Sequence, residues 1–475
     1  MKKTKTIITV GPSSKDIDVL RELIKNGADV IRINLSHADK SFCDDIIKKV
    51  RKLEEEFDKA IGIMLDTDGP SVRLDSFKEE VVVVEENKKV KLYSYPVICN
   101  NTQFSVNYSN IVDELDIGDV ILLGDGLVEF EVVDLFNDYA VLNTIVPGEI
   151  RSNQTVHVQG KSFKMPFLSE KDKNGILYGI KKNIDFIALS YVRDEQDVLE
   201  VTDLLIENGN NHMNIIAKIE NSRAIDNLDE ILKVCDGIMV ARGDLGIELS
   251  IEKLPFYQKL ILKKAREYEK TAIVATDFLH SMEDSLRPTR SEISDIYNAV
   301  MDNCDAIMLS GETTIGKYPV EVVDTLSKVI MSAEEDFDYG ENLQETFRNT
   351  KNDITSNIAF SVVDSSLRLK ASSILTNTNS GYTAIKISYF RPACPILALS
   401  PNIETTRLLT INYGIIPVIT TECKSTDTIV NVCTKKAISM FNYKGGEIVI
   451  ITGGFPISNK NTNFMKIEVI EKEKN

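Results

Sequence analysis

The chain has 475 residues, of which 43% are hydrophobic and 27% charged, with a net charge of −17 and a pI near 4.9. The length predicts about three domains, and the acidic balance argues against nucleic acid as a partner, because nucleic-acid binders present a basic face. Seven scattered cysteines without a C-x-x-C pair argue against a disulfide framework or a zinc site.

The start of the chain carries no convincing export signal. Two lysines precede a short apolar run that stops at Gly11 and Pro12. This run is too short for the apolar core of a signal peptide, and no later run approaches the roughly 20 residues of a membrane span. We therefore expect a cytoplasmic protein that has no membrane partner.

Short apolar strands alternate with amphipathic helical stretches over residues 1–71 and 165–340. Such alternation is typical of a parallel sheet covered on both faces. Eight units favour a (β/α)₈ TIM barrel, with a doubly wound sheet as the alternative. The predicted strands are 7–10, 30–34, 61–66, 186–189, 214–219, 237–241, 272–276 and 306–310.

Two further regions follow other patterns. Residues 72–164 are predicted to be all-β, inserted into the barrel domain as a β-barrel lid, with strands at 80–84, 90–93, 120–123 and 128–133 and a turn at 124–126. A charged segment, 334–349, is predicted to be a linker helix. Residues 353–475 are predicted to form a C-terminal α/β domain for effector binding and oligomerisation, with strands at 373–377, 395–399, 416–419 and 447–451.

Polar side chains stand at almost every predicted strand end of the barrel, where the active sites of such barrels lie. Because side chains alternate along a strand, Lys218 and Glu220 are predicted to share the inward face. Charges there are costly unless they are paired or bind a metal. The strand ends carry Arg32, Asn34, Ser36, His37, Asp66, Thr67, Ser190, Lys218, Glu220, Arg242, Asp244, Thr276, Ser310 and Glu312.

These residue types favour phosphoryl chemistry. Glu220 and Asp244 suit Mg²⁺, which takes one or two protein carboxylates and completes its shell with substrate oxygens and water. Lys218 could meet the negative charge of a phosphoryl group in transfer. Gly243 lets backbone N–H groups approach an anion at a helix start. A Lys–Glu pair alone is more often a structural ion pair, so the co-occurrence of all these groups carries the hypothesis.

Eight runs of the sequence resemble the pyruvate kinase family, over essentially the whole chain. The combination of IAKIEN, DGIMVARGDLGIE and IMLSGET in this order is highly specific. The runs are TVGPSS at 9–14, VIRINLSH at 30–37, LDTDGPSVR at 65–73, DFIALSYVR at 185–193, IAKIEN at 216–221, DGIMVARGDLGIE at 236–248, RPTRSE at 287–292 and IMLSGET at 307–313.

The resemblance implies transfer of a phosphoryl group from phosphoenolpyruvate to ADP, which gives pyruvate and ATP in glycolysis. It implies catalytic roles for Lys218, Arg32 and Thr276, and Mg²⁺ or Mn²⁺ on Glu220 and Asp244. Arg32, Thr276 and the backbone of Gly243 and Asp244 would bind the substrate. The resemblance further implies K⁺ bound by Asn34, Ser36, Asp66 and Thr67, and nucleotide contacts from Asn34, His37, Arg73 and Lys161.

This chain also departs from the family pattern near the cleft. Asp68 and Ser71 stand where the family usually has Lys and Glu, and Asp277 and His280 also differ. Two alternative functions therefore stay open. One is a weakened paralogue that binds ligands as a sensor, and the other is a barrel enzyme acting on a different enolpyruvate or keto acid.

A loop of the C-terminal domain is predicted to bind a phosphorylated effector. Residues 376–383 follow a strand and precede a predicted helix at 384–390, and no carboxylate interrupts them. Such a turn makes an anion cradle, with simple helix capping as the alternative. A second loop, 452–463, carries Lys460. The resemblance supports a phosphosugar or AMP at Thr376, Asn377, Thr378, Ser380, Gly381 and Thr383, and a homotetramer.

Overall fold

The computed structural model describes residues 1–475 except 125, 162, 211, 423–424, 455–461 and 472–475. Eight parallel strands close into a barrel, in the order β1-β16-β15-β14-β13-β12-β3-β2. The TIM barrel is therefore confirmed, and the doubly wound sheet is excluded, because β1 is hydrogen-bonded to both β2 and β16. The strands are β1 Lys5–Thr9, β2 Val30–Asn34, β3 Gly62–Asp66, β12 Phe186–Leu189, β13 Asn214–Ile219, β14 Gly237–Ala241, β15 Thr271–Ala275 and β16 Ala306–Leu309.

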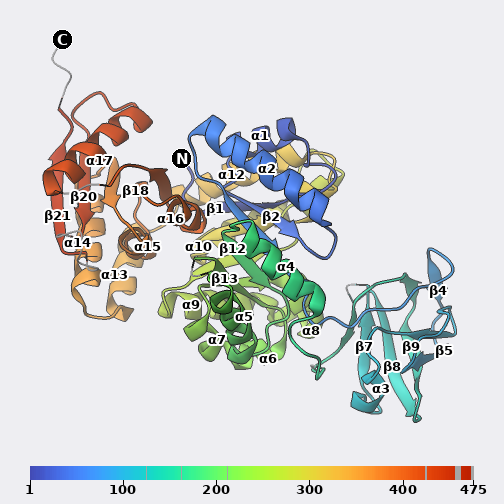
Figure 1. The fold of residues 1–475 in the computed structure, drawn as a ribbon. Coiled ribbons are helices and arrows are strands. Elements are labelled where there is room, and N and C mark those ends of the chain that lie inside the picture. Colours follow the sequence, from blue (N-terminus) through green and yellow to red (C-terminus); the bar gives the residue numbers. More distant parts are fainter. Residues whose placement is uncertain (125, 162, 211, 423–424, 455–461, 472–475) are drawn as a thin grey trace.

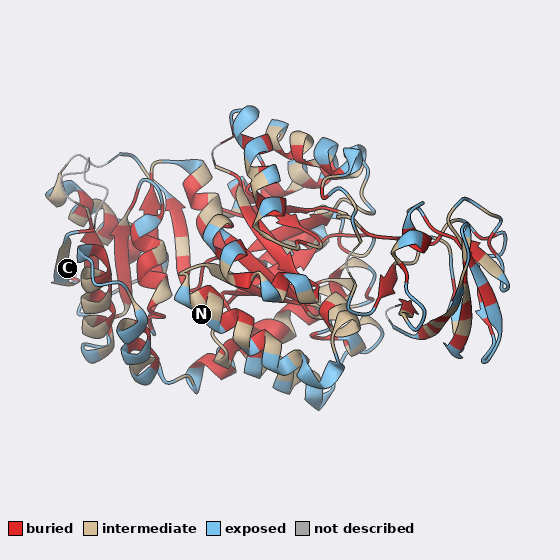
Figure 2. Cartoon of the chain, turned by 90° about the horizontal axis from the view of Figure 1, so that it is seen from below, coloured by how far each residue is buried: buried red, intermediate tan, exposed pale blue. Residues whose placement is uncertain are grey.

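The barrel strands are buried on both faces, which explains their nearly continuous apolar sequences (Figure 2). Inward side chains such as Met64, Ile216 and Met239 form a packed interior core. Their neighbours along each strand, such as Ala217 and Ile219, belong to a second core under the surrounding helices. This alternation carries Lys218 to the inward face, as predicted from its parity.

Helices surround the barrel (Figure 1). Several begin at a polar cap; Thr289 and Glu292, for example, form a capping box at the start of α10. Among the described residues, no helix is both long enough and apolar enough to cross a membrane. The helices are α1 Ile17–Lys25, α2 Lys40–Phe57, α4 Glu170–Lys181, α5 Glu195–Glu207, α6 Ser222–Asp226, α7 Leu228–Val234, α8 Arg242–Glu248, η1 Ile251–Lys253, α9 Leu254–Glu267, η2 His280–Glu283, α10 Arg290–Met301, α11 Gly311–Thr314 and α12 Pro319–Glu335.

The inserted region is all-β apart from one helical turn, α3 Ile111–Glu114, and has its own apolar core. It lies beside the barrel, on the side away from the C-terminal domain (Figure 1). A six-stranded sheet has the order β11-β7-β8-β9-β5-β6, and β10 pairs with β4. The strands are β4 Val82–Val84, β5 Lys89–Tyr93, β6 Gln103–Ser105, β7 Val120–Leu123, β8 Val128–Leu135, β9 Tyr139–Val146, β10 Gly148–Ile150 and β11 Val156–Val158.

The C-terminal domain is a five-stranded sheet in the order β19-β18-β17-β20-β21. A linker helix was predicted at 334–349, and its predicted start is wrong. Helix α12 extends to Glu335, and a separate helix, α13, begins after its cap Asp338. The elements are α13 Tyr339–Asn349, α14 Ile354–Arg368, β17 Ser373–Asn377, α15 Tyr382–Tyr389, β18 Ile396–Ser400, α16 Ile403–Leu408, η3 Leu409–Ile411, β19 Ile415–Ile419, α17 Thr426–Phe441, β20 Ile448–Gly453 and β21 Phe464–Val469.

Candidate active site

A buried network of charges lies at the carboxyl ends of the barrel strands. Arg32 on β2 donates from Nε to Oδ2 of Asp66 on β3 at 2.6 Å. Nζ of Lys218 on β13 lies 3.2 Å from Oδ1 of Asp66 and 2.8 Å from Oγ of Ser190. Because these strands are parallel neighbours, their last inward residues meet at one edge of the barrel. The structure therefore brings Arg32, Asp66 and Lys218 together.

Two carboxylates lie next to this network. Nζ of Lys218 lies 2.9 Å from Oε1 of Glu220, which immediately follows β13. Tyr191 donates from its backbone nitrogen to Oε2 of Glu220 at 2.5 Å, and its hydroxyl donates to Oδ1 of Asp244 at 2.8 Å. One tyrosine thus contacts both predicted metal ligands. The sequence-based interpretation gave Tyr191 no role and Ser190 only a place at a strand end.

Burial and mutual charge set the protonation of this site. Burial alone would lower the pKa of Lys218, but Asp66 and Glu220 raise it above its ordinary value. The pKa of Asp66 is below its ordinary value, because Arg32 and Lys218 outweigh the effect of burial. Burial raises the pKa of Glu220, and the nearby charge of Asp244 adds to this effect. The site therefore holds a permanent ammonium beside a carboxylate that would gain from a second cation.

Glu220 and Asp244 are chemically suited to a divalent cation. Oε1 of Glu220 is buried and has no directed hydrogen bond, although Nζ of Lys218 is close. A carboxylate oxygen is a hard ligand of the kind that Mg²⁺ takes, and here it faces one ammonium group, that of Lys218. Within the described part of the chain, no three His, Cys, Asp or Glu side chains gather as a complete metal site. Substrate oxygens and water would therefore have to complete the shell.

The predicted substrate-binding residues lie together at the start of α8. The backbone nitrogen of Gly243 donates to Oγ1 of Thr276 at 2.9 Å. Thr276 and Asp277 both have positive φ, of 73° and 55°, which is uncommon for residues other than glycine. Arg242 stacks on Phe278, with its guanidinium carbon 4.0 Å from the ring centroid. This strained turn after β15 aims Thr276 at the start of α8.

The four oxygens predicted to bind K⁺ lie on β2, β3 and the loops after them. Oδ1 of Asn34 accepts a hydrogen bond from the backbone nitrogen of Ser36 at 3.0 Å, and the carbonyl of Thr67 accepts one from Ser190 at 2.7 Å. Oγ of Ser36 donates to Asp68 at 2.9 Å. Several of these oxygens are therefore already held by protein donors.

The charge of Asp68 is matched by two nearby cations. Its Oδ1 accepts from Arg73 and its Oδ2 from Lys171, both at 2.9 Å. These contacts hold the pKa of Asp68 below its ordinary value, although burial opposes them. Asp68 therefore brings little unbalanced negative charge to the predicted K⁺ site.

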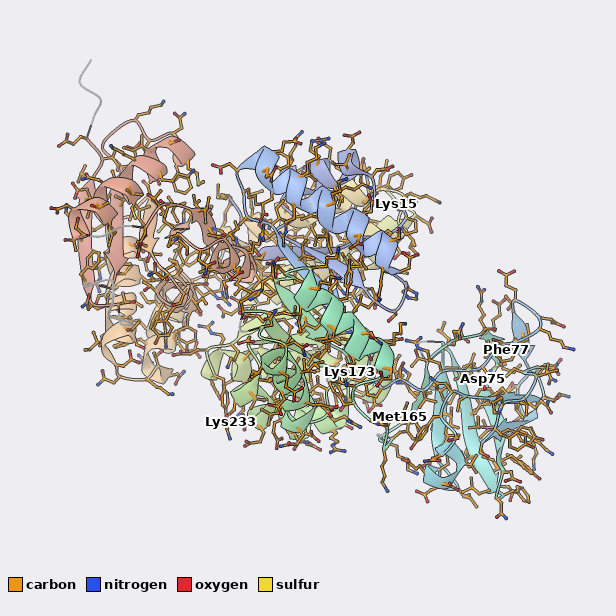
Figure 3. All side chains as sticks on the ribbon, in the orientation of Figure 1. Lys15, Asp75, Phe77, Met165, Lys173 and Lys233 are labelled. Atoms are coloured by element: carbon orange, nitrogen blue, oxygen red, sulfur yellow. The ribbon has the colours of Figure 1, made fainter. Side chains whose placement is uncertain are left out.

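The predicted nucleotide contacts separate into different places. Asn34 and His37 line a cavity of about 730 Å³ that also contacts Arg32, Phe42 and Lys15; Lys15 is labelled in Figure 3. Arg73 and Lys161 do not line this cavity.

Lys161 lies instead at a cleft between the inserted domain and the barrel. It pairs with Asp116 and Asp119 at 2.7 and 2.6 Å and lines a cavity of about 60 Å³ with Tyr191 and Glu248. The chain returns to the barrel beside this cleft at Met165 (Figure 3), whose carbonyl accepts a hydrogen bond from Arg193 at 2.9 Å. Among the described residues, Asn34 and Lys161 therefore line two different cavities.

The predicted effector loop joins β17 to α15. Oγ1 of Thr378 accepts a hydrogen bond from the backbone nitrogen of Gly381 at 3.0 Å, and Gly381 has φ of 85°. Thr383 bonds to Thr462 at 2.8 Å. Oγ1 of Thr376 is buried and has no hydrogen-bond partner in the described structure. Most of the second loop, including Lys460, lies outside the described residues.

Two family models match the chain. The model described as "Pyruvate kinase, barrel domain" matches residues 1–323, and the one described as "Pyruvate kinase, alpha/beta domain" matches residues 356–468. A protein of Sporosarcina psychrophila named "Pyruvate kinase" is 38% identical over 473 residues, which cover 99% of this chain and 81% of the relative. Proteins of the same name from Staphylococcus saprophyticus and Staphylococcus aureus are also 38% identical, over 100% of this chain and 81% of theirs.

Proposed function

Because this chain belongs to the pyruvate kinase family, and is thus a phosphotransferase, we propose that it transfers the phosphoryl group of phosphoenolpyruvate to ADP. The observation that carries this proposal is the position of Lys218. Its ammonium is buried between Asp66 and Glu220 at the carboxyl end of the barrel, in the same network as Arg32. A fixed cation of this kind stabilises negative charge that develops on a transferring phosphoryl group.

Transfer breaks the bond between phosphorus and the enol oxygen of phosphoenolpyruvate and forms a bond to the terminal phosphate of ADP. Arg32 holds the phosphate oxygens. Lys218 offsets the charge of the phosphoryl group in flight and of the enolate that is left. The enolate then takes a proton at carbon and becomes pyruvate. The carboxylate of the substrate is held by Thr276 and by the backbone nitrogens of Gly243 and Asp244. Thr276 follows β15 and contacts Gly243 at the start of α8.

Glu220 and Asp244 hold Mg²⁺ or Mn²⁺ in this proposal. The raised pKa of Glu220, which burial and the neighbouring charge of Asp244 cause, supports the assignment, because a bound cation would offset both effects. When bound, the cation would neutralise and orient phosphate oxygens. Asn34, Ser36, Asp66 and Thr67 are proposed to bind K⁺, although several of their oxygens would first have to release protein donors.

The nucleotide is proposed to bind at Asn34 and His37, where the cavity of about 730 Å³ is large enough for it. Closure of the inserted domain would bring Arg73 and Lys161 toward it and exclude water. Thr376, Asn377, Thr378, Ser380, Gly381 and Thr383 are proposed to bind a phosphosugar or AMP, supported by the unpartnered hydroxyl of Thr376. A homotetramer is the proposed assembly.

A pyruvate-formation assay coupled to lactate dehydrogenase tests the proposal. The purified chain should form pyruvate from phosphoenolpyruvate only when ADP and Mg²⁺ are both present, and EDTA should stop the reaction. Full activity in EDTA would refute the metal assignment. Binding of phosphoenolpyruvate without turnover would instead favour a sensor, and turnover of another enolpyruvate or keto acid would favour a different barrel enzyme.

A further inference from the structure

Tyr191 is the residue that joins the two predicted metal-binding carboxylates. It follows Ser190 at the end of β12, with its backbone at a φ of 55°. Its backbone nitrogen donates to Oε2 of Glu220 at 2.5 Å, and its hydroxyl donates to Oδ1 of Asp244 at 2.8 Å. The two hydrogen bonds run to different elements, because Glu220 follows β13 and Asp244 lies in the first turn of α8, after β14.

The backbone of Tyr191 is in a conformation that a bulky side chain rarely adopts. A left-handed residue other than glycine persists only where its surroundings hold it, and such residues gather at functional sites. Here the turn aims the nitrogen of Tyr191 at Glu220 and its side chain at Asp244. The hydrogen bonds to the two carboxylates are therefore what the strained turn provides.

Each hydrogen bond occupies one oxygen of a carboxylate and leaves the other. Oε1 of Glu220 takes no bond from Tyr191 and lies 2.9 Å from Nζ of Lys218, and Oδ2 is the second oxygen of Asp244. A carboxylate that is hydrogen-bonded through one oxygen keeps a fixed orientation and presents the other oxygen to a cation. The pair would otherwise repel each other and could rotate apart.

We propose that Tyr191 is a positioning residue for the divalent cation, which orients Glu220 through its backbone nitrogen and Asp244 through its hydroxyl. This inference rests on the proposed function, because it takes both carboxylates as metal ligands. Substitution of Tyr191 by phenylalanine removes the hydroxyl and keeps the ring and the backbone, so it tests the bond to Asp244 alone. It acts through Asp244 and need not touch the substrate.

The decisive experiment measures Mn²⁺ binding to the substrate-free protein, by the electron paramagnetic resonance signal of the free ion. We expect Tyr191→Phe to raise the Kd for Mn²⁺ about 10-fold, the lower end of the usual effect of losing a hydrogen bond to a metal ligand. The apparent activation constant for Mg²⁺ should rise by a similar factor, and kcat should return to about the wild-type value at saturating Mg²⁺. A merely structural role would not be rescued by metal.

The chain offers a matched control in Tyr178, whose hydroxyl donates to Oδ1 of Asp44 at 2.6 Å on the outside of the barrel. Tyr178→Phe deletes a bond of the same chemistry and should leave the Kd for Mn²⁺ unchanged. Unchanged or tighter Mn²⁺ binding in Tyr191→Phe would overturn the inference while pyruvate formation by the wild type left the proposed function intact. If the wild type itself bound no Mn²⁺, the metal assignment and this inference would both fail.

Discussion

The buried lysine at the barrel mouth is held by opposite charges rather than by apolar packing. Asp66 and Glu220 both lie within ion-pair distance of Lys218, and Asp66 is also paired with Arg32. Removing the ammonium therefore leaves Asp66 compensated by Arg32. The fold should tolerate this loss better than the loss of a lone buried ion pair.

Lys218→Met should lower kcat by about 100-fold or more, the usual cost of removing one preorganised charge from a developing anion. Circular dichroism should show the wild-type fold. Lys233→Met is a suitable control, because it removes an exposed lysine paired with Glu230 on α7. Wild-type turnover in Lys218→Met would remove Lys218 from the mechanism.

Glu248 provides a pH-dependent test of the cleft between the inserted domain and the barrel. Burial raises the pKa of Glu248 to about 7, and Oε2 is buried without a hydrogen-bond partner among the described residues. The folded protein therefore binds a proton at Glu248 more tightly than the unfolded chain does. This contribution to stability is fully present below about pH 4.5 and is lost as the pH rises through 7.

Glu248→Gln should consequently gain stability relative to the wild type as the pH rises. We expect its thermal midpoint to be close to that of the wild type at pH 5 and at least about 2 °C higher at pH 8. Scanning calorimetry at both values measures this difference. Glu207→Gln, at an exposed position on α5, should show no such trend. If it did, the pH dependence of stability could not be assigned to Glu248 and its cleft.

At the scale of elements, the loops after β2 and β3 test the predicted K⁺ site. K⁺ should activate turnover relative to buffer with tetramethylammonium as the cation. Lys171→Met should lower the K⁺ concentration needed, because it frees Oδ2 of Asp68 and removes a competing positive charge. Equal rates in the two buffers would refute the K⁺ site. An unchanged K⁺ requirement in Lys171→Met would show that Lys171 does not affect K⁺ binding.

The β17–α15 loop tests the predicted effector site. A phosphosugar or AMP should lower the KM for phosphoenolpyruvate, and Thr378→Glu should abolish this effect, because a carboxylate would stand where the phosphate binds. Thr378→Ser should retain the effect, since its hydroxyl can still accept the hydrogen bond from Gly381. If no phosphosugar or nucleotide monophosphate changes the kinetics or the thermal midpoint, only the capping role of Thr378 remains.

The barrel strands were predictable because parallel strands buried on both faces are nearly continuous apolar runs. Four of the eight predicted ranges differ from the structure by a few residues at an end, as for the first strand, Lys5–Thr9. In the inserted domain, β6, β9, β10 and β11 were missed. β9 mixes polar with apolar residues, Tyr139–Val146, because only one of its faces is buried. The separation of α12 from α13 was missed because charged residues continue across it.

The candidate site was predictable only in part. Strand parity predicted that Lys218 and Glu220 share one face, and their position at a strand end grouped them with Asp66 and Arg32. Neither argument reaches Tyr191, whose contacts depend on a left-handed turn after β12 and on side-chain direction. The pairing of Asp68 with Lys171 likewise joins residues 103 positions apart, on elements whose packing the sequence alone does not reveal.

At the scale of the whole molecule, ion pairs of buried and partly buried side chains connect the C-terminal domain to the barrel. Arg391 pairs with Asp305 at 2.6 Å, and Arg407 pairs with Glu54 at 2.5 Å. Nζ of Lys5 donates to the carbonyl of Ile415 at 2.5 Å. Ile411 also packs into the interior core of the barrel. The two domains should therefore unfold together.

Arg391→Met should destabilise this interface strongly, because Asp305 would remain buried and unpaired, a change that costs about 3–5 kcal/mol. Scanning calorimetry should show the single transition of the wild type replaced by two, with the C-terminal domain melting first. Arg368→Met, which breaks an exposed ion pair with Asp364 within α14, should leave one transition. A single unshifted transition in Arg391→Met would contradict the coupling.

Closure of the barrel between β1 and β16 also bears on how the chain is made. β1 pairs with β16 in the register of Lys5 with Ala306, so one edge of β1 stays open until some 300 more residues have been synthesised. At about 5–20 residues per second this takes roughly 15–60 s. During that time the nascent chain exposes unpaired strand edges, which can pair with other chains. The inserted sheet, complete long before, can fold in the meantime, and a nascent chain that stalls before β16 would be the form most in need of a chaperone.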